Sequence, residues 1–187
     1  YMLYLEFNRD PDKKFYVPRR SVLKEEVDAL QDLEDDKLDL LTLSQPPGIG
    51  KSTLATFYLT WLMGRSPHMP SLASGHSSIL TTGIYGGVMA ILEDPVEYLW
   101  HDVFPSVQLV DKSAKFTTVD LNKKKRFPTL TCRSIDGSLT GATRCEKLLY
   151  SDDLVQGIEE SMSIDRLDKL WEKYTNDLKS RKKQGCK

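Results

Sequence analysis

The sequence has few of the residues that mark a secreted, membrane or metal-binding protein. Its 187 residues include three cysteines and three histidines, with no CxxC pair and no metal-ligand spacing between the two residue types. No apolar run is long enough to span a bilayer, and we expect no signal peptide. We therefore expect a cytoplasmic protein with no disulfide framework, no zinc site and no membrane contact.

An excess of charge of either sign is also missing. Lys and Arg total 26 and Asp and Glu total 27, so the net charge of −1 predicts no polyanionic partner. Contact with nucleic acid would require a local basic patch, and the densest is the Lys-Lys-Lys-Arg run at 123–126, which is equally typical of a solvated hairpin tip. The length suits one α/β domain over 1–187. Because the chain begins with Tyr1 and stops at Lys187 just after a predicted helix, we expect a fragment of a longer protein.

One stretch organises the rest of the sequence. An apolar run at 38–43 is followed by a breaker cluster at 45–48, then Gly-Lys-Ser at 50–52 and a long apolar segment at 53–63. The order of strand, glycine-containing loop, Lys-Ser and helix predicts a phosphate-binding P-loop. The unpaired N–H groups at a helix N-terminus carry partial positive charge, which stabilises an anion there. The predicted nucleotide-binding residues are Gln45, Pro46, Pro47, Gly48, Ile49, Gly50, Lys51, Ser52 and Thr53.

The residue types in this loop predict separate roles. Gly48 and Gly50 are expected to adopt positive φ and to let the backbone approach a phosphate. Lys51 is expected to reach the β- and γ-phosphates of ATP, and the Ser52 hydroxyl is expected to ligate Mg²⁺. The first glycine of the usual G-x-x-x-x-G-K-[ST] pattern would fall at Gln45, so only the second half of the motif matches. The alternative interpretation is an ordinary strand-to-helix turn with an exposed lysine.

A second stretch supplies the acids that a P-loop requires. The apolar residues at 148–150 predict a short buried strand, and Asp152 and Asp153 follow it. The metal and the attacking water both need carboxylates at the carboxyl end of the strand beside the P-loop strand. We predict that Asp152 holds Mg²⁺ and that Asp153 polarises the water. Adjacent aspartates are also common in plain turns.

The remaining sequence alternates between helical and strand patterns, as expected of an α/β fold. The predicted helices cover 21–33, 53–63, 82–92 and the segment after 161, and the predicted strands cover 38–43, 71–76, 112–120, 130–135 and 148–151. We expect a mostly parallel central sheet with helices on both faces. His76 is interpreted as a surface-loop residue, with a place in a polar site as the alternative. Tyr16 and Arg19 are interpreted as packing residues rather than residues that stack on a base.

With both stretches placed, the chain resembles the ATPase domain of phage large terminase subunits, the motors that drive viral DNA into capsids. The resemblance lies in the Pro-Pro-containing loop at 44–53, in Tyr-Leu-Trp-His-Asp-Val-Phe-Pro at 98–105, and in the stretch at 140–153 that ends in Asp-Asp. It implies a P-loop NTPase fold of the ASCE type that hydrolyses ATP with Mg²⁺. It also implies a homo-oligomeric ring on a portal protein around double-stranded DNA, a small terminase subunit as partner, and a place on the procapsid in the host bacterial cytoplasm. The C-terminal nuclease domain of the family has no room in 1–187.

The resemblance further implies a role for Arg144. An arginine in this region of terminases is proposed to act as a finger on the ATP of a neighbouring subunit, and such a charge accelerates hydrolysis by about 10³–10⁵ in other NTPases. Many family P-loops carry an arginine inside the loop, whereas this chain has Gly48 there, which favours Arg144. Asp153 stands where many relatives have glutamate, so slower intrinsic hydrolysis is expected. The alternative is a surface arginine in a loop.

Two further functions stay open on the sequence alone. A nucleotide kinase or another P-loop phosphotransferase would need an acceptor pocket and a lid with clustered arginines, and the sequence indicates neither. A nucleotide-gated assembly module would use ATP only to order a ring interface. Replacement of Asp153 by Asn would separate the last alternative from a motor, because a gate would keep assembly while a motor would lose packaging.

Overall fold

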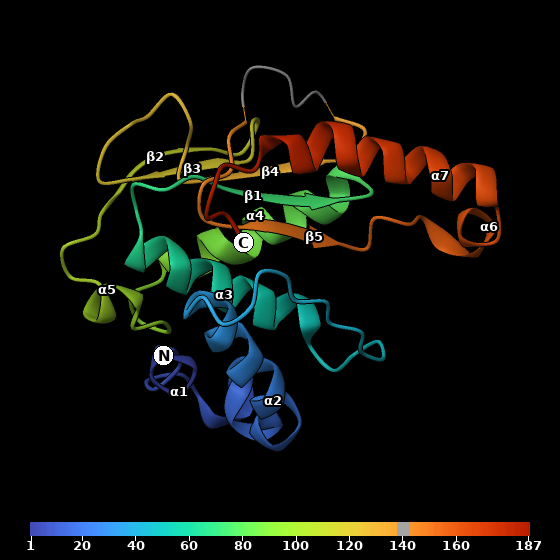
Figure 1. The fold of residues 1–187 in the computed structure, drawn as a ribbon. Helices are drawn as coiled ribbons and strands as arrows, with labels where there is room; N and C mark the ends of the chain where they lie inside the picture. The colour runs from blue at the N-terminus through green and yellow to red at the C-terminus, as the bar shows by residue number, and fades with distance from the viewer. Residues whose placement is uncertain (138–142) are drawn as a thin grey trace.

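The computed structural model describes residues 1–137 and 143–187. Within these ranges the centre is a five-stranded sheet in the order β2-β3-β4-β1-β5 (Figure 1). The strands are β1 (Ser71–Gly75), β2 (Leu109–Ser113), β3 (Thr118–Leu121), β4 (Leu130–Ser134) and β5 (Leu149–Asp152). β1 is parallel to β4 and β5, whereas β3 is antiparallel to β2 and β4.

The α/β class is therefore confirmed, but the expectation of a mostly parallel sheet is wrong. The segment predicted as one strand at 112–120 contains the turn between β2 and β3. A turn this short can join antiparallel strands only, because a parallel pair needs a crossover of about a dozen residues or more. The parallel part of the sheet is limited to β4, β1 and β5.

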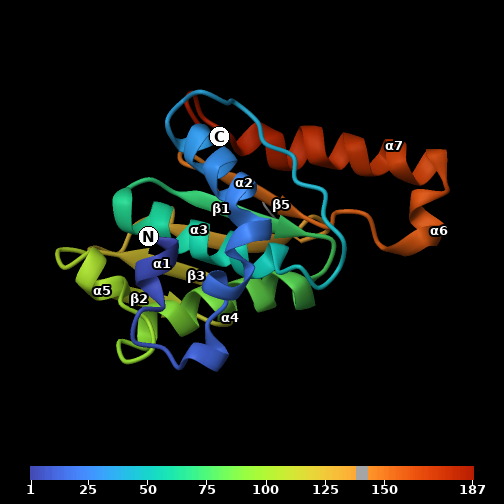
Figure 2. The same ribbon diagram turned by 90° about the horizontal axis from the view of Figure 1, so that it is seen from below.

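Helices lie on both sides of this sheet. They are α1 (Met2–Leu5), α2 (Tyr16–Glu34), α3 (Lys51–Arg65), α4 (Ser78–Glu93), α5 (Trp100–Val103), α6 (Gly157–Ser161) and α7 (Ile164–Lys173). After α7 the chain continues as a π-helical turn (Tyr174–Leu178) and a 3-10 turn (Lys179–Arg181). α3 and α4 cover one face of the sheet, and α1 and α2 lie outside α3 (Figures 1 and 2). No helix in the described ranges is long and apolar enough to cross a membrane.

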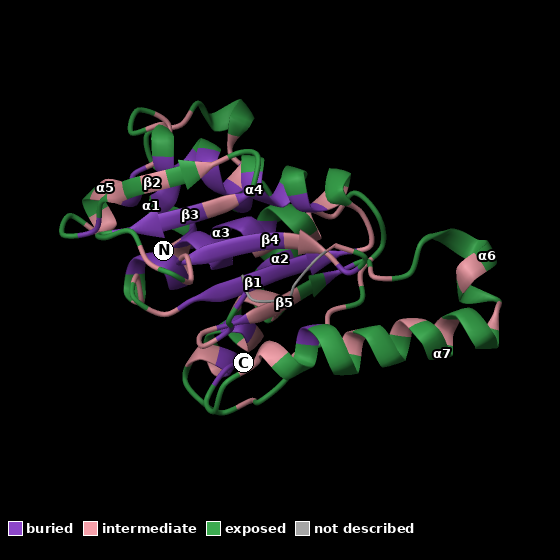
Figure 3. Ribbon diagram, turned by 90° about the horizontal axis from the view of Figure 1, so that it is seen from above, coloured by how far each residue is buried: buried purple, intermediate pink, exposed green. Residues whose placement is uncertain are grey.

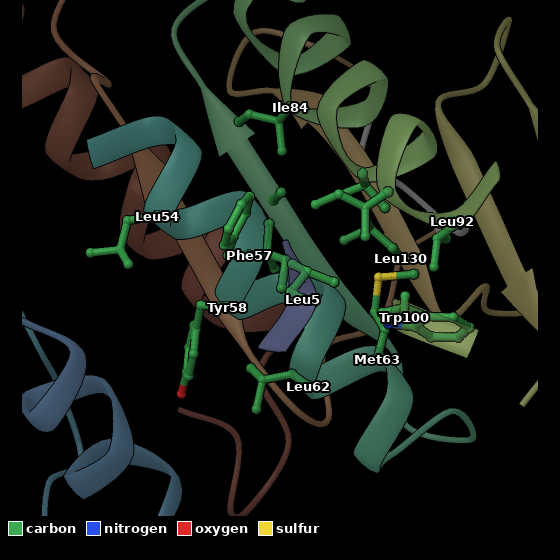
Figure 4. Close-up of a cluster of buried hydrophobic side chains, with 14 of the residues drawn as sticks. Leu5, Leu54, Phe57, Tyr58, Leu62, Met63, Ile84, Leu92, Trp100 and Leu130 are labelled. Atoms are coloured by element: carbon green, nitrogen blue, oxygen red, sulfur yellow. The ribbon is translucent and has the colours of Figure 1, made fainter. Parts of the chain in front are cut away.

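The two faces of the sheet are covered unequally. The larger apolar cluster lies under α3 and α4 and includes Phe57, Ile84 and Leu130 (Figure 4). A smaller cluster on the other face consists of Leu72, Ile135, Cys145, Leu178 and Cys186. Successive residues of a strand point to opposite faces of the sheet, so Leu72 packs in the smaller cluster and Ala73 in the larger one. Most of α6 and α7 is exposed, and α6 lies beyond the carboxyl ends of β1 and β5 (Figure 3).

The predicted strand at 38–43 is not formed. This segment is irregular and pairs with no described strand, and Leu40 is 71% exposed, although Leu38 and Leu41 still pack against the larger cluster. The place beside the start of β5 is occupied by Lys187, whose carbonyl accepts the Leu149 N–H at 2.8 Å. The Lys187 amine lies 3.0 Å from Asp36 and 3.1 Å from Asp39. Lys187 therefore lies between β5 and the segment that leads into the loop.

Helix α2 begins earlier than predicted. The predicted helix starts at residue 21, but in the structure the N–H groups of Phe15 and Tyr16 donate to the buried carboxylate of Glu6 at 2.8 and 3.1 Å. Glu6 is 1% exposed and pairs with Arg9 at 2.9 Å. A carboxylate at this position satisfies unpaired N–H groups and favours the positive end of the helix. The cap comes from another segment of the chain, so local sequence patterns did not predict it.

Candidate functional site

The loop that precedes α3 contains two glycines with left-handed backbone conformation. Gly48 and Gly50 have φ of +84° and +108°, in the left-handed region that glycine adopts at little cost. Helix α3 begins at Lys51, so the first-turn N–H groups have no intrahelical acceptor. The predicted positive φ of both glycines is confirmed. Because α3 starts directly after Gly50, its positive dipole end lies at the loop.

Packing also requires glycine at position 50. A Cβ there would lie 2.3 Å from Phe15 Cε2. The Phe15 ring contacts Phe57 edge-on, with 5.4 Å between centroids, and the Arg19 guanidinium lies 5.2 Å from the Phe15 centroid. Tyr16 is buried, as expected of a packing residue. The N-terminal segment therefore supports the loop through Phe15.

Gln45, which replaces the usual first glycine, is attached to α2. Its Nε2 donates to Glu26 Oε1 at 2.5 Å. The other two polar atoms of this pair, Gln45 Oε1 and Glu26 Oε2, are buried and have no hydrogen-bond partner within the described part of the chain. The departure from the usual motif thus supplies an anchor between the loop and α2, and the Gln45 amide is directed to Glu26.

Lys51, Ser52, Asp152 and Asp153 converge at the carboxyl end of β5. Lys51 Nζ lies 3.0 Å from Asp152 Oδ1 and 3.0 Å from Asp153 Oδ1. The Ser52 hydroxyl donates to Asp152 Oδ2 at 3.4 Å. The Asp152 side chain is 3% exposed, whereas that of Asp153 is 62% exposed. The fold brings together the amine and the two acids that the sequence singled out.

The charges of this cluster are unevenly balanced. Burial lowers the pKa of Lys51, but the hydrogen bonds and charges of Asp152 and Asp153 outweigh burial, and the net pKa lies above its ordinary value. Lys51 is therefore protonated at neutral pH. One ammonium faces two carboxylates. If Lys51 paired with another anion instead, Asp152 and Asp153 would be left to bind a cation.

The oxygen donors of the cluster fit Mg²⁺ held partly by water and phosphate. No group of three or more His, Cys, Asp or Glu side chains in 1–137 and 143–187 is arranged to hold a metal ion. Mg²⁺ seldom uses such a cage, because it keeps several waters and binds one or two carboxylates together with substrate phosphates. The Asp152 carboxylate and the Ser52 hydroxyl provide donors of this kind.

Tyr150 lies two residues before Asp152 on the same face of β5. Its hydroxyl oxygen is buried. Burial, followed by the nearby charge of Asp152, raises the pKa of Tyr150 well above its ordinary value. The phenol therefore stays neutral and adds no charge to the cluster.

His76 contacts the site directly, although the sequence favoured a surface-loop residue over a residue of a polar site. Its backbone N–H lies 3.3 Å from the Asp153 carbonyl oxygen, and its Nδ1 lies 2.7 Å from the same atom. His76 follows β1 as Asp153 follows β5, and Gly75 is paired with Asp152 in the parallel ladder. Only this pairing brings the two residues together, so no local sequence signal could have identified His76.

Arg144 does not join this cluster. The Glu146 N–H donates to the carbonyl of Pro70, directly before β1, at 2.8 Å, which places this stretch at the amino end of the parallel strands. Lys51 lies at the opposite, carboxyl end. Arg144 Nε pairs with Glu146 at 2.5 Å, and the guanidinium lies 5.8 Å from the Phe127 centroid. Within one chain, Arg144 is remote from the phosphates that Lys51 would hold.

The basic run at 123–126 lies in the connection between the antiparallel strands β3 and β4. Lys124 pairs with Asp111 at 2.8 Å. The Lys125 amine donates to the Pro67 carbonyl at 2.5 Å and to the Thr129 hydroxyl at 2.6 Å. Two of the four cations are thus used in holding the connection, which favours the hairpin interpretation over a DNA-tracking patch.

Comparison with known proteins adds no family assignment. A scan against protein-family models and a search of curated proteins found no match to this chain. Residues 140–142, part of the stretch that carries the resemblance to terminases, lie outside the described residues. A functional assignment therefore rests on the geometry of the loop and its acids, together with that resemblance.

Proposed function

We propose that this chain is the ATP-hydrolysing motor domain of a phage large terminase, a P-loop NTPase of the ASCE type that drives double-stranded viral DNA into the procapsid. The contact of Lys51 with both Asp152 and Asp153, beside a loop with two left-handed glycines, carries the nucleotide-binding part of the proposal. The motor part rests on the resemblance of 44–53, 98–105 and 140–153 to terminases.

The loop at 45–53 would hold the phosphates of ATP. Lys51 would exchange its two carboxylate partners for β- and γ-phosphate oxygens, assisted by the first-turn N–H groups of α3. Asp152 and Ser52 would then be available to ligate Mg²⁺. Bound Mg²⁺ would neutralise the charge that develops on the phosphates. Asp153, the more exposed acid, would accept a hydrogen bond from the attacking water and orient it.

A ring on the portal protein would complete this site. A head-to-tail contact between subunits joins two different surfaces of the same chain. Arg144 and Lys51 lie at opposite ends of β5, so such a contact would allow Arg144 of one subunit to act on the ATP of the next. The isolated domain should accordingly be a weak ATPase. Double-stranded DNA and the small terminase subunit are the other proposed partners.

Replacement of Lys51 by Ala tests the nucleotide site. Charge-assisted hydrogen bonds contribute about 1.5–3 kcal/mol each, so calorimetric titration with ATP and Mg²⁺ should show at least tenfold to hundredfold weaker binding, by rough conversion. Lys37→Ala is the matched control, because Lys37 pairs with Asp32 at an exposed surface away from the loop. Thermal unfolding of both variants checks that they are folded. Unchanged ATP affinity in folded Lys51→Ala would overturn the proposed function.

A further inference from the structure

The backbone of Asp153 is held by two donors from one residue. The parallel pairing of Gly75 with Asp152 places the residues that follow, His76 and Asp153, side by side at the same edge of the sheet. The Asp153 carbonyl lies 3.3 Å from the His76 backbone nitrogen and 2.7 Å from the imidazole Nδ1. A carbonyl oxygen can only accept, so Nδ1 must carry the proton of the neutral ring.

Asp153 needs this support because its backbone is strained. Its φ is +41°, in the left-handed region that costs a non-glycine residue about 1–2 kcal/mol. Its carboxylate is also held by Lys51, at 3.0 Å. If ATP draws Lys51 to the phosphates, that restraint is lost at the moment when the carboxylate must be aimed. The His76 contacts do not involve Lys51, so they persist.

We propose that His76 is a positioning residue for hydrolysis. Its Nδ1–H holds Asp153 in the left-handed conformation and thereby directs the Asp153 carboxylate toward the attacking water. This inference rests on the proposed ATPase function. His76 acts on the end of β5 and not on the loop that would bind the phosphates. Its loss should therefore slow the chemical step and leave ATP affinity unchanged.

Three substitutions separate the Nδ1–H donor from the size of the ring. His76→Asn keeps an N–H donor at the position of Nδ1, His76→Gln places its amide nearer the position of Nε2, and His76→Ala removes the donor. Single-turnover hydrolysis with enzyme in excess gives the rate at saturation and the half-saturating concentration, the counterparts of kcat and KM. We expect Ala and Gln to lower the rate about tenfold to a hundredfold, and Asn to stay within about threefold of the original chain.

In all three variants the half-saturating concentration should stay unchanged. His68→Ala is the control, because His68 is exposed and lies before β1, at the other end of the sheet. Nitrogen-15 NMR of the nucleotide-free protein supplies a readout that is independent of activity, with the Nδ1–H tautomer expected at His76. An Nε2–H tautomer, an Asn variant as slow as Ala, or a weakened affinity at constant rate would each overturn the positioning role.

The same measurements distinguish this inference from the proposed function. If the original chain hydrolyses ATP and His76→Ala is equally fast, the positioning role fails and the ATPase function stands. If the original chain does not hydrolyse ATP under single-turnover conditions, both fail. The Lys51→Ala titration decides nucleotide binding without reference to His76.

Discussion

The two ends of the parallel strands β1 and β5 arrange their charges differently. At the carboxyl end, Lys51 from α3 contacts two acids that follow it by about a hundred residues in sequence. At the amino end, Arg144 pairs with Glu146, two positions along the chain. A pair between near neighbours can form in any exposed loop. A cluster that requires the whole sheet and α3 forms only in the folded protein.

This difference separates phosphate and metal binding, for which one chain has the groups, from any catalytic role of Arg144, which requires a second chain. The carboxyl-end cluster contains an amine, two carboxylates and a hydroxyl, and therefore has its own groups for binding phosphate and metal. Arg144 at the amino end has no route to those groups within the chain. If it serves catalysis, it does so across a subunit interface.

The largest effect is expected for Arg144→Ala in the assembled ring. ATP binding by the single chain should be unchanged, whereas hydrolysis by rings on the portal protein should fall by about 10³-fold or more if the arginine acts in trans. Mixed rings provide the sharper measurement. Arg144→Ala and Lys51→Ala chains should each be inactive alone but should recover hydrolysis when mixed, because one supplies the loop and the other the arginine. No recovery in rings shown to contain both chains would refute a role in trans.

A smaller loss is expected when Asp153 is changed to Asn at the carboxyl end. The amide keeps the size of the side chain but cannot act as a base, so single-turnover hydrolysis should fall by about 10²–10³ while ATP affinity stays within a few-fold. Asp136→Asn is a suitable control, since Asp136 follows β4 at the same edge of the sheet and pairs with Lys173. Phosphoryl transfer to a small acceptor in the original chain would instead favour a kinase-like enzyme.

The sequence predicted the elements whose signals are local. The apolar run after Lys51 is long enough to indicate α3, and the short runs at 71–76 and 130–135 are bounded clearly enough to indicate β1 and β4. The run at 38–43 has the same composition as a strand. Whether such a run joins a sheet depends on a free partner, and Lys187 occupies the start of β5. Composition carries no information about that competition.

The same limit applies to the site. Lys51, Asp152 and Asp153 were predicted from local patterns: a glycine-containing loop before an apolar helix for Lys51, and a short apolar strand before the two acids. His76 was interpreted as a surface residue because its contact with Asp153 depends on the pairing of β1 with β5. Glu6 was missed for a similar reason, because it caps α2 from outside the helix. Local sequence patterns do not predict contacts that depend on strand register or on a long loop.

The smallest effect is expected for Glu6→Gln, which tests whether support from α2 reaches the carboxyl-end cluster. The amide keeps one acceptor for the Phe15 N–H but loses the charge that pairs with Arg9, so the free energy of unfolding in urea should fall by about 1–3 kcal/mol. Because Phe15 packs against Gly50, ATP affinity should weaken slightly at the same time. Glu25→Gln, on the exposed side of α2, should change neither quantity. A destabilised Glu6→Gln chain with unchanged ATP affinity would show that the loop holds its shape without Phe15, and that Gln45 and its partner Glu26 are sufficient to anchor it.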